Sequence, residues 1–255
     1  MVEICQGALP HKPWRQDHTR RLPGLNPIAP GAWLIIDDAY GAQLAYKARL
    51  MAEKGGEVVQ LAPEAEAAAG ELLALVLREL KGKPDFEVQE THVTCPDGRR
   101  VMIDHDAPLQ TCGQLVQEDL CIMQKQGDEH VLTGALLCFP ASWSLAQKFM
   151  RPLIAIHDPV ASYNADIARR VQRLFDGIQV DRPMWRANFL TYSDPDLFQP
   201  RRTQERRRVD PDAPKWMRVE RQGLRKLPET GAVIFSIHTY VVPFCALSED
   251  DIIAL

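Results

Sequence analysis

"FEVQETHVTCPDGRRVMID", residues 86–104, is the stretch where the hydrophobic pattern of the chain changes from a helical period to a strand period. Two β-type runs flank Pro96-Asp97-Gly98, which is a strong turn signal for a β-hairpin. Helical patterns precede this stretch, and strand patterns dominate after it. Helices followed by mainly antiparallel strands, with further helices between them, predict an α+β domain.

Two helices are predicted before the hairpin. Residues 41–56 place apolar side chains on one helical face and end at a glycine pair that can cap the helix C-terminus. Residues 63–80 begin at Pro63, a residue favoured in the first helical turn, and are apolar enough for a more buried helix. Residues 1–30 are rich in proline and polar groups, so we expect an arm that lies over the surface of the domain.

Strand patterns recur after the hairpin. They cover residues 130–139, 186–193 and 231–242, whereas residues 162–178 carry an apolar stripe at helical spacing. Near the C-terminus, "SEDD" (248–251) has the Ser-x-x-Asp form of a helix capping box. These segments complete the predicted α+β fold.

The composition is ordinary for a soluble globular protein: the 255 residues are 45% hydrophobic and 25% charged. The net charge of −4 says little about partners and conceals a basic stretch over residues 201–226. The N-terminus lacks the apolar segment of a secretory signal, and the densest apolar run, residues 72–77, is too short to span a bilayer. We therefore expect a cytoplasmic protein with no membrane partner.

Six cysteines are scattered along the chain without a Cys-x-x-Cys pair. This spacing argues against a zinc ribbon and against a self-contained iron–sulfur site. The chain also has no glycine-rich phosphate loop, no Gly-x-Ser-x-Gly motif and no His-Glu-x-x-His motif. The usual nucleotide-binding, serine-hydrolase and zinc-protease classes therefore lose their support.

His157 stands where a strand-like apolar run meets a turn in "RPLIAIHDPVASYN" (151–164). Asp158 and Pro159 follow it, and a helical pattern begins directly after the turn. A rigid strand-to-helix corner can present a neutral imidazole to a metal or to haem iron. The alternative is a hydrogen-bonded structural histidine, which is the commoner role of a lone histidine near an apolar run.

A second group of candidate residues lies in "KWMRVERQGLRKLP" (215–228). If the segment is helical, Arg218, Arg221 and Arg225 fall at i, i+3 and i+7 on one face. Such a face is either solvated or an arginine fork for a dianionic ligand, such as the two propionates of haem. DNA binding is less favoured, because Trp216 is the only aromatic residue of the segment and no DNA-binding module is recognisable.

Two further groups give weaker signals. His92 and His105 become diagonal neighbours if the hairpin turn sets the register, but two histidines without a third ligand make a weak metal site. Glu118 and Asp119 are adjacent carboxylates in "QEDLC" (117–121), and adjacent side chains need not face one cavity. We expect these two carboxylates on the solvated surface.

Six short motifs occur in order along the chain. They are "QEDLCIM" (117–123), "CFPASW" (138–143), "IHDPV" (156–160), "RANF" (186–189), "ERQGLRKLP" (220–228) and "IHTY" (237–240). Together they resemble the catalytic (alpha) subunit family of haem-dependent oxidative N-demethylase. The resemblance runs from "LPHKPW" (9–14) to the C-terminus, so it covers nearly the whole chain.

The resemblance implies a PAS-like antiparallel sheet core with an N-terminal helical extension. A single haem-binding domain would span residues 1–255, with the arm and helices in residues 1–85 and the sheet core and haem site in residues 86–255. The haem would be haem b, bound without covalent attachment, because the chain has no Cys-x-x-Cys-His motif.

The resemblance also implies an enzyme. Its haem would activate dioxygen to oxidise a methyl group of a secondary amine such as dimethylamine, releasing formaldehyde and the demethylated amine. Electrons would arrive from NADPH through flavin and iron–sulfur partner subunits, which fits a chain without dinucleotide or cluster motifs. The alternative is a PAS-like haem sensor of gas or redox state, although this sequence shows no coiled coil or output domain.

Residue by residue, the resemblance implies that His157 is the axial ligand of the haem iron. In the same reading Arg221 would donate a hydrogen bond to bound dioxygen, and Glu220 would bind the protonated amine. The other candidates for contacts with the haem are Arg186, Arg218 and Arg225. Two positions depart from the family's pattern: Ala161 stands where proline is expected, and His238 stands where arginine is expected. The second departure concerns the distal side of the haem and hence the substrate.

Overall fold

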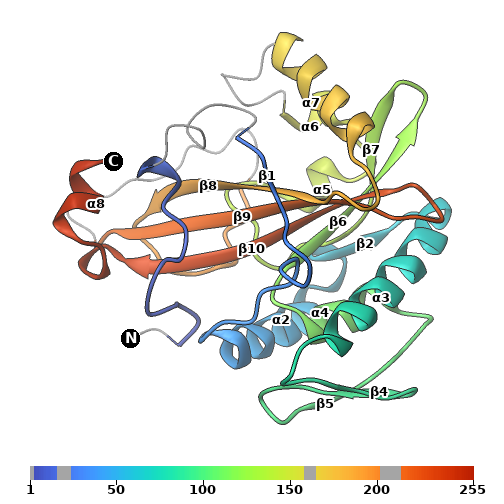
Figure 1. Ribbon diagram of the computed structural model, residues 1–255, viewed down its shortest axis with the longest axis horizontal. Coiled ribbons are helices and arrows are strands. Elements are labelled where there is room, and N and C mark those ends of the chain that lie inside the picture. The colour runs from blue at the N-terminus through green and yellow to red at the C-terminus, as the bar shows by residue number, and fades with distance from the viewer. Residues whose placement is uncertain (1–2, 16–23, 158–164, 202–213) are drawn as a thin grey trace.

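The computed structural model describes residues 3–15, 24–157, 165–201 and 214–255, which form an α+β fold around a large antiparallel sheet (Figure 1). In this part of the chain the sheet has seven strands, in the order β1-β8-β9-β10-β6-β7-β2. Their bounds are β1 Asn26–Pro27, β2 Val59–Leu61, β6 Asp119–Gln126, β7 Glu129–Leu136, β8 Met184–Tyr192, β9 Trp216–Lys226 and β10 Val233–Pro243. The predicted α+β class is confirmed, while the likeness to PAS domains stays a prediction.

Helices lie on both sides of this sheet, as Figure 1 shows. One side holds α2 (Tyr40–Lys54), α3 (Glu66–Lys81) and α4 (Pro108–Leu115), and the other holds α5 (Leu145–Lys148), α6 (Leu153–His157) and α7 (Ala165–Gly177). Near the C-terminus lies α8 (Glu249–Ile253). The predicted helices over 41–56 and 162–178 are α2 and α7, and the one over 63–80 is the 3-10 turn η3 (Pro63–Ala65) followed by α3. In the described ranges, no helix is both long enough and apolar enough to cross a membrane.

The hairpin in residues 86–104 is confirmed, but it stands apart from the large sheet. β4 (His92–Thr94) pairs with β5 (Arg100–Met102), and β3 (Glu87–Val88) adds a third short strand. Gly98 has a φ of +80°, a left-handed conformation that glycine adopts in tight turns without a steric penalty. The hairpin packs against the main apolar core through Val93 and Val101.

Two segments have a different secondary structure from the predicted one. Residues 216–226 form strand β9, and not the helix on which the three arginines would share one face. β9 pairs with β8 and with β10, and these two ladders override the helix-like spacing of its arginines. Residues 153–157, predicted as the end of a strand, form the short helix α6. A short apolar run fits either structure, so its periodicity alone does not decide between them.

Both edge strands of the sheet come from the N-terminal part of the chain. β1 pairs with β8, and β2 pairs with β7, although the sequence predicts only an arm and helices for residues 1–85. β1 has two residues and β2 has three, so neither is long enough to show the alternation that identifies a strand. Segments from both sides of residue 85 therefore share one sheet.

We name the two faces of the sheet after the helices that cover them. The α2 face carries Ile122 and Ile234, which pack with buried leucines of α2 and α3. The α7 face carries Val233 and Ile237, which pack with Phe175 of α7. Because each face is covered, side chains at both odd and even positions of the central strands are withdrawn from water.

The N-terminal arm is fastened to α8 through Asp251. Ser248 and Asp251 form the capping box that the sequence predicts. Asp251 also accepts hydrogen bonds from Lys12 at 2.6 Å and Arg15 at 3.0 Å, and its backbone oxygen accepts one from the indole of Trp14 at 2.9 Å. The two ends of the described chain are therefore held together.

A buried ion pair joins α2 to β6. Lys47 Nζ lies 3.4 Å from Asp119 Oδ1, and neither side chain is more than 1% exposed. Lys47 also donates to the backbone oxygens of residues 116–118, and Asp119 accepts from the backbone N–H groups of Cys138 and Phe139. The sequence-based prediction of a solvated Asp119 is wrong, because its charge has a partner charge and several donors in the interior.

Replacing Lys47 with methionine should lower the free energy of unfolding by about 3–5 kcal/mol, because Asp119 would be left buried without its partner charge. Chemical denaturation followed by circular dichroism measures the change. Lys54→Met is the control, since Lys54 lies on the same helix, is 35% exposed and is 4.0 Å from Glu57. The control should change stability by less than about 1 kcal/mol. Equal losses in the two variants would contradict the role of the buried pair.

Candidate functional site

β9 distributes the candidate residues over both faces of the sheet. Side chains alternate along a strand, so Arg218 and Glu220 point to the α7 face, whereas Arg221 and Arg225 point to the α2 face. The predicted single face with three arginines is therefore wrong. Arg186 of β8 shares the α7 face with Arg218 and Glu220, as the register of the β8–β9 ladder requires.

Arg221 and Arg225 are both engaged on the α2 face. Arg221 donates to the backbone oxygens of residues 32–33 at 2.9 and 3.2 Å, and its guanidinium lies 5.0 Å from the ring centre of Trp185. Arg225 donates to Glu79 Oε1 at 2.7 Å. These contacts fasten the segment before α2, and helix α3, to the sheet. Neither guanidinium lies on the face that carries the proposed amine-binding carboxylate.

Glu220 lies at the centre of a polar cluster on the α7 face. Asn188, Glu220 and Thr239 stand side by side across β8, β9 and β10. Gln222 Nε2 donates to Glu220 Oε2 at 3.1 Å, and Arg218 Nε lies 3.4 Å from Glu220 Oε1. The side chain of Glu220 is only 8% exposed, so the protein holds an acidic group in a nearly dry environment.

The charges around Glu220 act in opposite directions on its protonation. Burial raises the pKa of the Glu220 carboxyl, whereas the charge of Arg218 and the hydrogen bond from Gln222 counteract part of that rise. The Asp119 carboxylate adds to the rise. Burial lowers the pKa of Arg186, and the negative charge of Glu220 opposes this shift. The cluster therefore couples one buried acid to two arginines.

Some polar groups of this cluster form no hydrogen bond with the residues that the structure describes. Thr239 Oγ1 is buried and forms no hydrogen bond there. Arg218 Nε forms no hydrogen bond either, but its partner is Glu220 Oε1, with which it forms an ion pair at 3.4 Å. The guanidinium of the half-buried Arg186 forms no hydrogen bond or ion pair with the described residues. Buried polar groups in folded proteins are nearly always hydrogen-bonded, so such groups mark a place where a ligand or water binds.

Apolar side chains adjoin this polar cluster on the same face. Phe235 and Met184 are only partly buried and pack, with Ile156 of α6, against the core that α7 covers. His157 is the last residue of α6, so it lies at the end of a helix and not at the predicted strand-to-helix corner. Its side chain lies outside the described residues, as do residues 158–164, which include Ala161.

The weaker candidates do not form a metal site. His105 lies beyond the end of β5, and His92 Nδ1 instead lies 3.1 Å from Arg100 Nη2. Within the ranges that the structure describes, no group of three or more His, Cys, Asp or Glu could hold a metal ion. Glu118 is 1% exposed, so its predicted place on the solvated surface is wrong. The physical reason is its pairing with a buried histidine.

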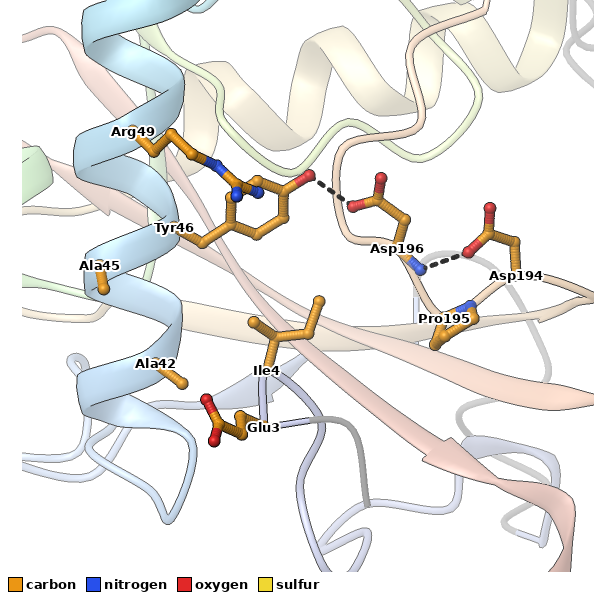
Figure 2. Close-up of a pocket in the computed structure, with 9 residues that line it drawn as sticks. All are labelled: Glu3, Ile4, Ala42, Ala45, Tyr46, Arg49, Asp194, Pro195 and Asp196. Atoms are coloured by element: carbon orange, nitrogen blue, oxygen red, sulfur yellow. Dashed lines mark hydrogen bonds between the residues drawn. The ribbon is translucent and has the colours of Figure 1, made fainter.

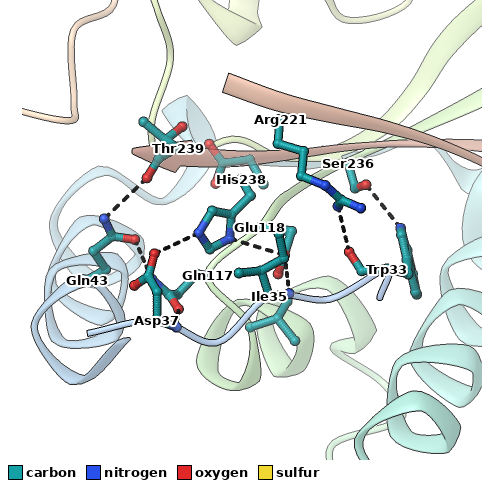
Figure 3. A network of polar contacts seen from close by, with 12 residues as sticks. Trp33, Ile35, Asp37, Gln43, Gln117, Glu118, Arg221, Ser236, His238 and Thr239 are labelled. Carbon is teal, nitrogen blue, oxygen red and sulfur yellow. Dashed lines mark hydrogen bonds and ion pairs between the residues drawn. The ribbon is translucent and has the colours of Figure 1, made fainter. Parts of the chain in front are cut away.

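That histidine is His238, the centre of a network on the α2 face (Figure 3). His238 Nε2 lies 3.0 Å from Asp37 Oδ2, and His238 Nδ1 lies 3.2 Å from Glu118 Oε1. Gln117 donates to Asp37 at 2.7 Å, and the backbone N–H of Ile35 donates to Glu118 at 2.8 Å. The members come from distant parts of the chain, so the one sequence signal for this network is the unexpected histidine itself.

The network keeps His238 protonated. Burial alone would lower the pKa of His238, but the hydrogen bonds and negative charges of Asp37 and Glu118 raise it to about 9. At neutral pH the histidine is therefore a cation, as the arginine expected from the resemblance would be. The position requires a positive charge between two carboxylates, and either residue supplies one.

A surface pocket of about 450 Å³ lies between the N-terminal segment, α2 and the residues after β8 (Figure 2). At its edge, Tyr46 Oη donates to Asp196 Oδ1 at 2.6 Å, and the backbone N–H of Asp196 donates to Asp194 Oδ1 at 2.9 Å. Its lining residues are Glu3, Ile4, Ala42, Ala45, Tyr46, Arg49, Asp194, Pro195 and Asp196. None of them is a predicted site residue or a member of the Glu220 cluster.

The charge on His238 should make stability fall with rising pH. The pKa of His238 is raised to about 9 in the folded protein, against about 6.5 for an unfolded histidine. Its stabilisation is thus fully present below about pH 6.5 and is lost as pH rises through about 9, by up to about 1.4 kcal/mol per pH unit. Denaturation at a series of pH values measures this slope.

His238→Arg is the matched control, because arginine stays charged throughout this range. The buried cysteines of both proteins contribute equally, so the difference between the two slopes isolates His238. A slope in His238→Arg as steep as in the parent protein would show that His238 is not the titrating cation.

The family described as "Haem-dependent oxidative N-demethylase, alpha subunit-like" matches residues 24–254 of this chain. The match includes all strands of the described sheet and every candidate residue of the α7 face. It confirms the resemblance that the six motifs indicate. The chain belongs to the haem-dependent oxidative N-demethylase, alpha subunit-like family.

Proposed function

We propose that this protein is a haem enzyme that oxidatively removes a methyl group from a small secondary amine such as dimethylamine. In the overall reaction, the amine, dioxygen, two electrons and two protons give the demethylated amine, formaldehyde and water. One oxygen atom ends in formaldehyde and the other in water. The observation that carries the proposal is the incompletely paired Arg186–Glu220 cluster beside an apolar surface, in a chain of this family.

The residues of the α7 face fit a haem chemically. A haem has an apolar ring and two propionates, so its site needs apolar side chains, cationic donors and an axial ligand. Phe235, Met184 and Ile156 supply a partly buried apolar surface. Arg186 supplies a guanidinium that no described residue engages. His157 ends the helix that packs on the same face.

When bound, haem supplies the activation of dioxygen and the oxidation of the methyl group. In the proposal His157 holds the iron through its imidazole, and Arg186 binds a propionate through its guanidinium. Helix α6 is fixed for this task, because Leu153 is part of the α7-face core and Lys148 Nζ donates to the backbone oxygen of Ile156. Arg221 has no part here, since it is engaged on the opposite face.

Glu220 is the proposed partner of the amine. Small aliphatic amines, like the lysine side chain, are protonated at neutral pH, so a carboxylate is their natural complement. An ion pair is stronger in the nearly dry surroundings of Glu220 than in water. Further along the same face, Phe235 adds a partly buried apolar side chain. In this way the side chain of Glu220 sets where the amine nitrogen lies.

The electrons must come from a partner. Cys245 is exposed and the other five cysteines are buried. The family is described as alpha subunit-like, which supports an enzyme of several subunits. We propose NADPH as the electron source, with flavin and iron–sulfur partner subunits as carriers. We also propose a single haem-binding domain over residues 1–255 and a cytoplasmic location.

The purified protein should bind haem b, and with a reductant and dioxygen it should release formaldehyde from dimethylamine. His157→Ala should remain folded but lose the axial bond, with altered Soret and ferrous–CO spectra and no demethylation. Added imidazole should partly restore the spectrum by occupying the vacated position. Absorption spectra, a pyridine haemochromogen assay and formaldehyde determination measure these results.

His238→Arg is the control and should keep the parent spectrum. A colourless protein that takes up no haemin would overturn the proposal. An unchanged spectrum in His157→Ala would overturn the ligand assignment alone. Haem binding without amine-dependent turnover would favour the sensor over the enzyme.

Arg186→Ala should weaken haem retention about tenfold to a hundredfold, because a charge-assisted hydrogen bond contributes about 1.5–3 kcal/mol. Transfer of haem to apomyoglobin measures the loss. Arg225→Ala is the control: it removes an arginine from the opposite face, where the partner is Glu79. Equal haem retention in the two variants would remove Arg186 from the haem site.

A further inference from the structure

We infer that Arg218 and Gln222 are positioning residues that hold the carboxylate of Glu220 in one orientation, as an anion, to receive the ammonium group of the substrate. The inference rests on the proposed function and deepens it. It changes the role of Arg218, which the arginine spacing made a candidate for contact with the haem, to one exercised through Glu220.

Arg218 is fixed at both terminal nitrogens. Nη1 donates to the backbone oxygen of Leu197 at 3.1 Å, and Nη2 donates to that of Phe139. The side chain is 1% exposed, so it is enclosed on all sides. With both terminal nitrogens held, Nε faces Glu220 Oε1 at 3.4 Å and the guanidinium cannot turn away without breaking two hydrogen bonds. This rigid cation fixes one side of the carboxylate.

Gln222 fixes the other side. It lies two residues after Glu220 on β9 and therefore on the same face. Its Nε2 donates to Glu220 Oε2 at 3.1 Å. Each carboxylate oxygen thus has one neighbour on β9: Arg218 for Oε1 and Gln222 for Oε2. A carboxylate offers about four acceptor positions, so both oxygens can still accept from an ammonium group.

The charges that face Glu220 show why these two side chains are needed. Arg218 comes from the same strand, Arg186 from β8 and Asp119 from β6. Burial and the Asp119 charge favour the neutral acid, while Arg218 and Gln222 favour the anion. A neutral carboxylic acid loses the charge that attracts an ammonium group. The two positioning residues therefore act on amine binding more than on the oxidation itself.

Arg218 also connects β9 with the segments after β7 and β8, so its removal alone would not separate positioning from folding. Gln222 makes the cleaner test, because Glu220 is the one hydrogen-bond partner of its side chain among the described residues. Gln222→Met keeps the length of the side chain and removes the donor. Arg218→Lys keeps the charge and removes the fork that is bound to the two backbone oxygens.

The experiment uses the haem-loaded protein and dimethylammonium, from about pH 6 to about pH 9, where the amine stays protonated. Gln222→Met should raise KM about tenfold at neutral pH and less at the alkaline end, with kcat changed less than about twofold. Arg218→Lys should shift KM in the same direction. The Soret band should stay unchanged. Gln60→Met and Arg225→Lys are matched controls away from the cluster and should leave KM unchanged.

An unchanged KM in Gln222→Met at every pH would overturn the inference, and so would an equal rise at every pH together with an altered Soret band. If Arg218→Lys does not fold, Gln222→Met decides alone. Failure of the proposed function looks different, because the parent protein itself would then bind no haem or release no formaldehyde. Parent turnover with the same KM in Glu220→Gln would overturn the inference while leaving the haem enzyme in place.

Discussion

The buried pair Lys47–Asp119 fixes the geometry on which the α7 face depends. A carboxylate this deep in the interior requires a counter-charge and hydrogen-bond donors, and Asp119 takes them from Lys47 and from the N–H groups of Cys138 and Phe139. The same pair therefore sets the course of the chain after β7. The backbone oxygen of Phe139 then accepts from Arg218, whose Nε faces Glu220. The contact between helix α2 and Asp119 is thus linked to the proposed amine site through consecutive polar contacts.

The two faces of the sheet differ in how completely their cationic side chains are engaged. On the α2 face, Arg221, Arg225 and His238 all have partners in the described structure. Each face has a buried oxygen without a hydrogen bond among the described residues, Glu118 Oε2 on the α2 face and Thr239 Oγ1 on the α7 face. Only on the α7 face is there a guanidinium, that of Arg186, with which no described residue forms a hydrogen bond or ion pair. An unengaged buried cation is costly, so it marks a place where a ligand or water can complete it. This difference, rather than the number of arginines, locates the proposed site.

The parts of the fold that the sequence predicted correctly are those that depend on short sequence patterns. Gly98 marks the hairpin turn, Pro63 opens the turn before α3, and Ser248 with Asp251 caps α8, each through contacts within a few residues. The course of β9 could not be predicted this way, because charged side chains occur on both of its faces and hide the alternation. What makes this segment a strand is its pairing with β8 and β10, which depends on distant residues.

The same limit applies to the candidate site. The order of the six motifs indicated the family and made Arg186 and Glu220 candidate site residues. The register of β8 and β9 then shows that both side chains lie on the same face of the sheet. The arginines at 221 and 225 fall on the opposite face for the same reason. Glu118 and Asp119 were predicted on the surface because their partners lie far from them in the sequence. His238 pairs with Glu118, and Lys47 pairs with Asp119.

The departure at His238 then has a structural meaning. The sequence related this position to the distal side of the haem, yet the side chain lies on the α2 face, between Asp37 and Glu118. Its neighbour Thr239 points to the opposite face, beside Glu220. Two buried carboxylates require a cation between them. The raised pKa of His238 keeps its imidazole protonated at neutral pH, so this histidine is the cation. The exchange of arginine for histidine thus concerns the support of the sheet on the α2 face, and the polar cluster lies on the other face.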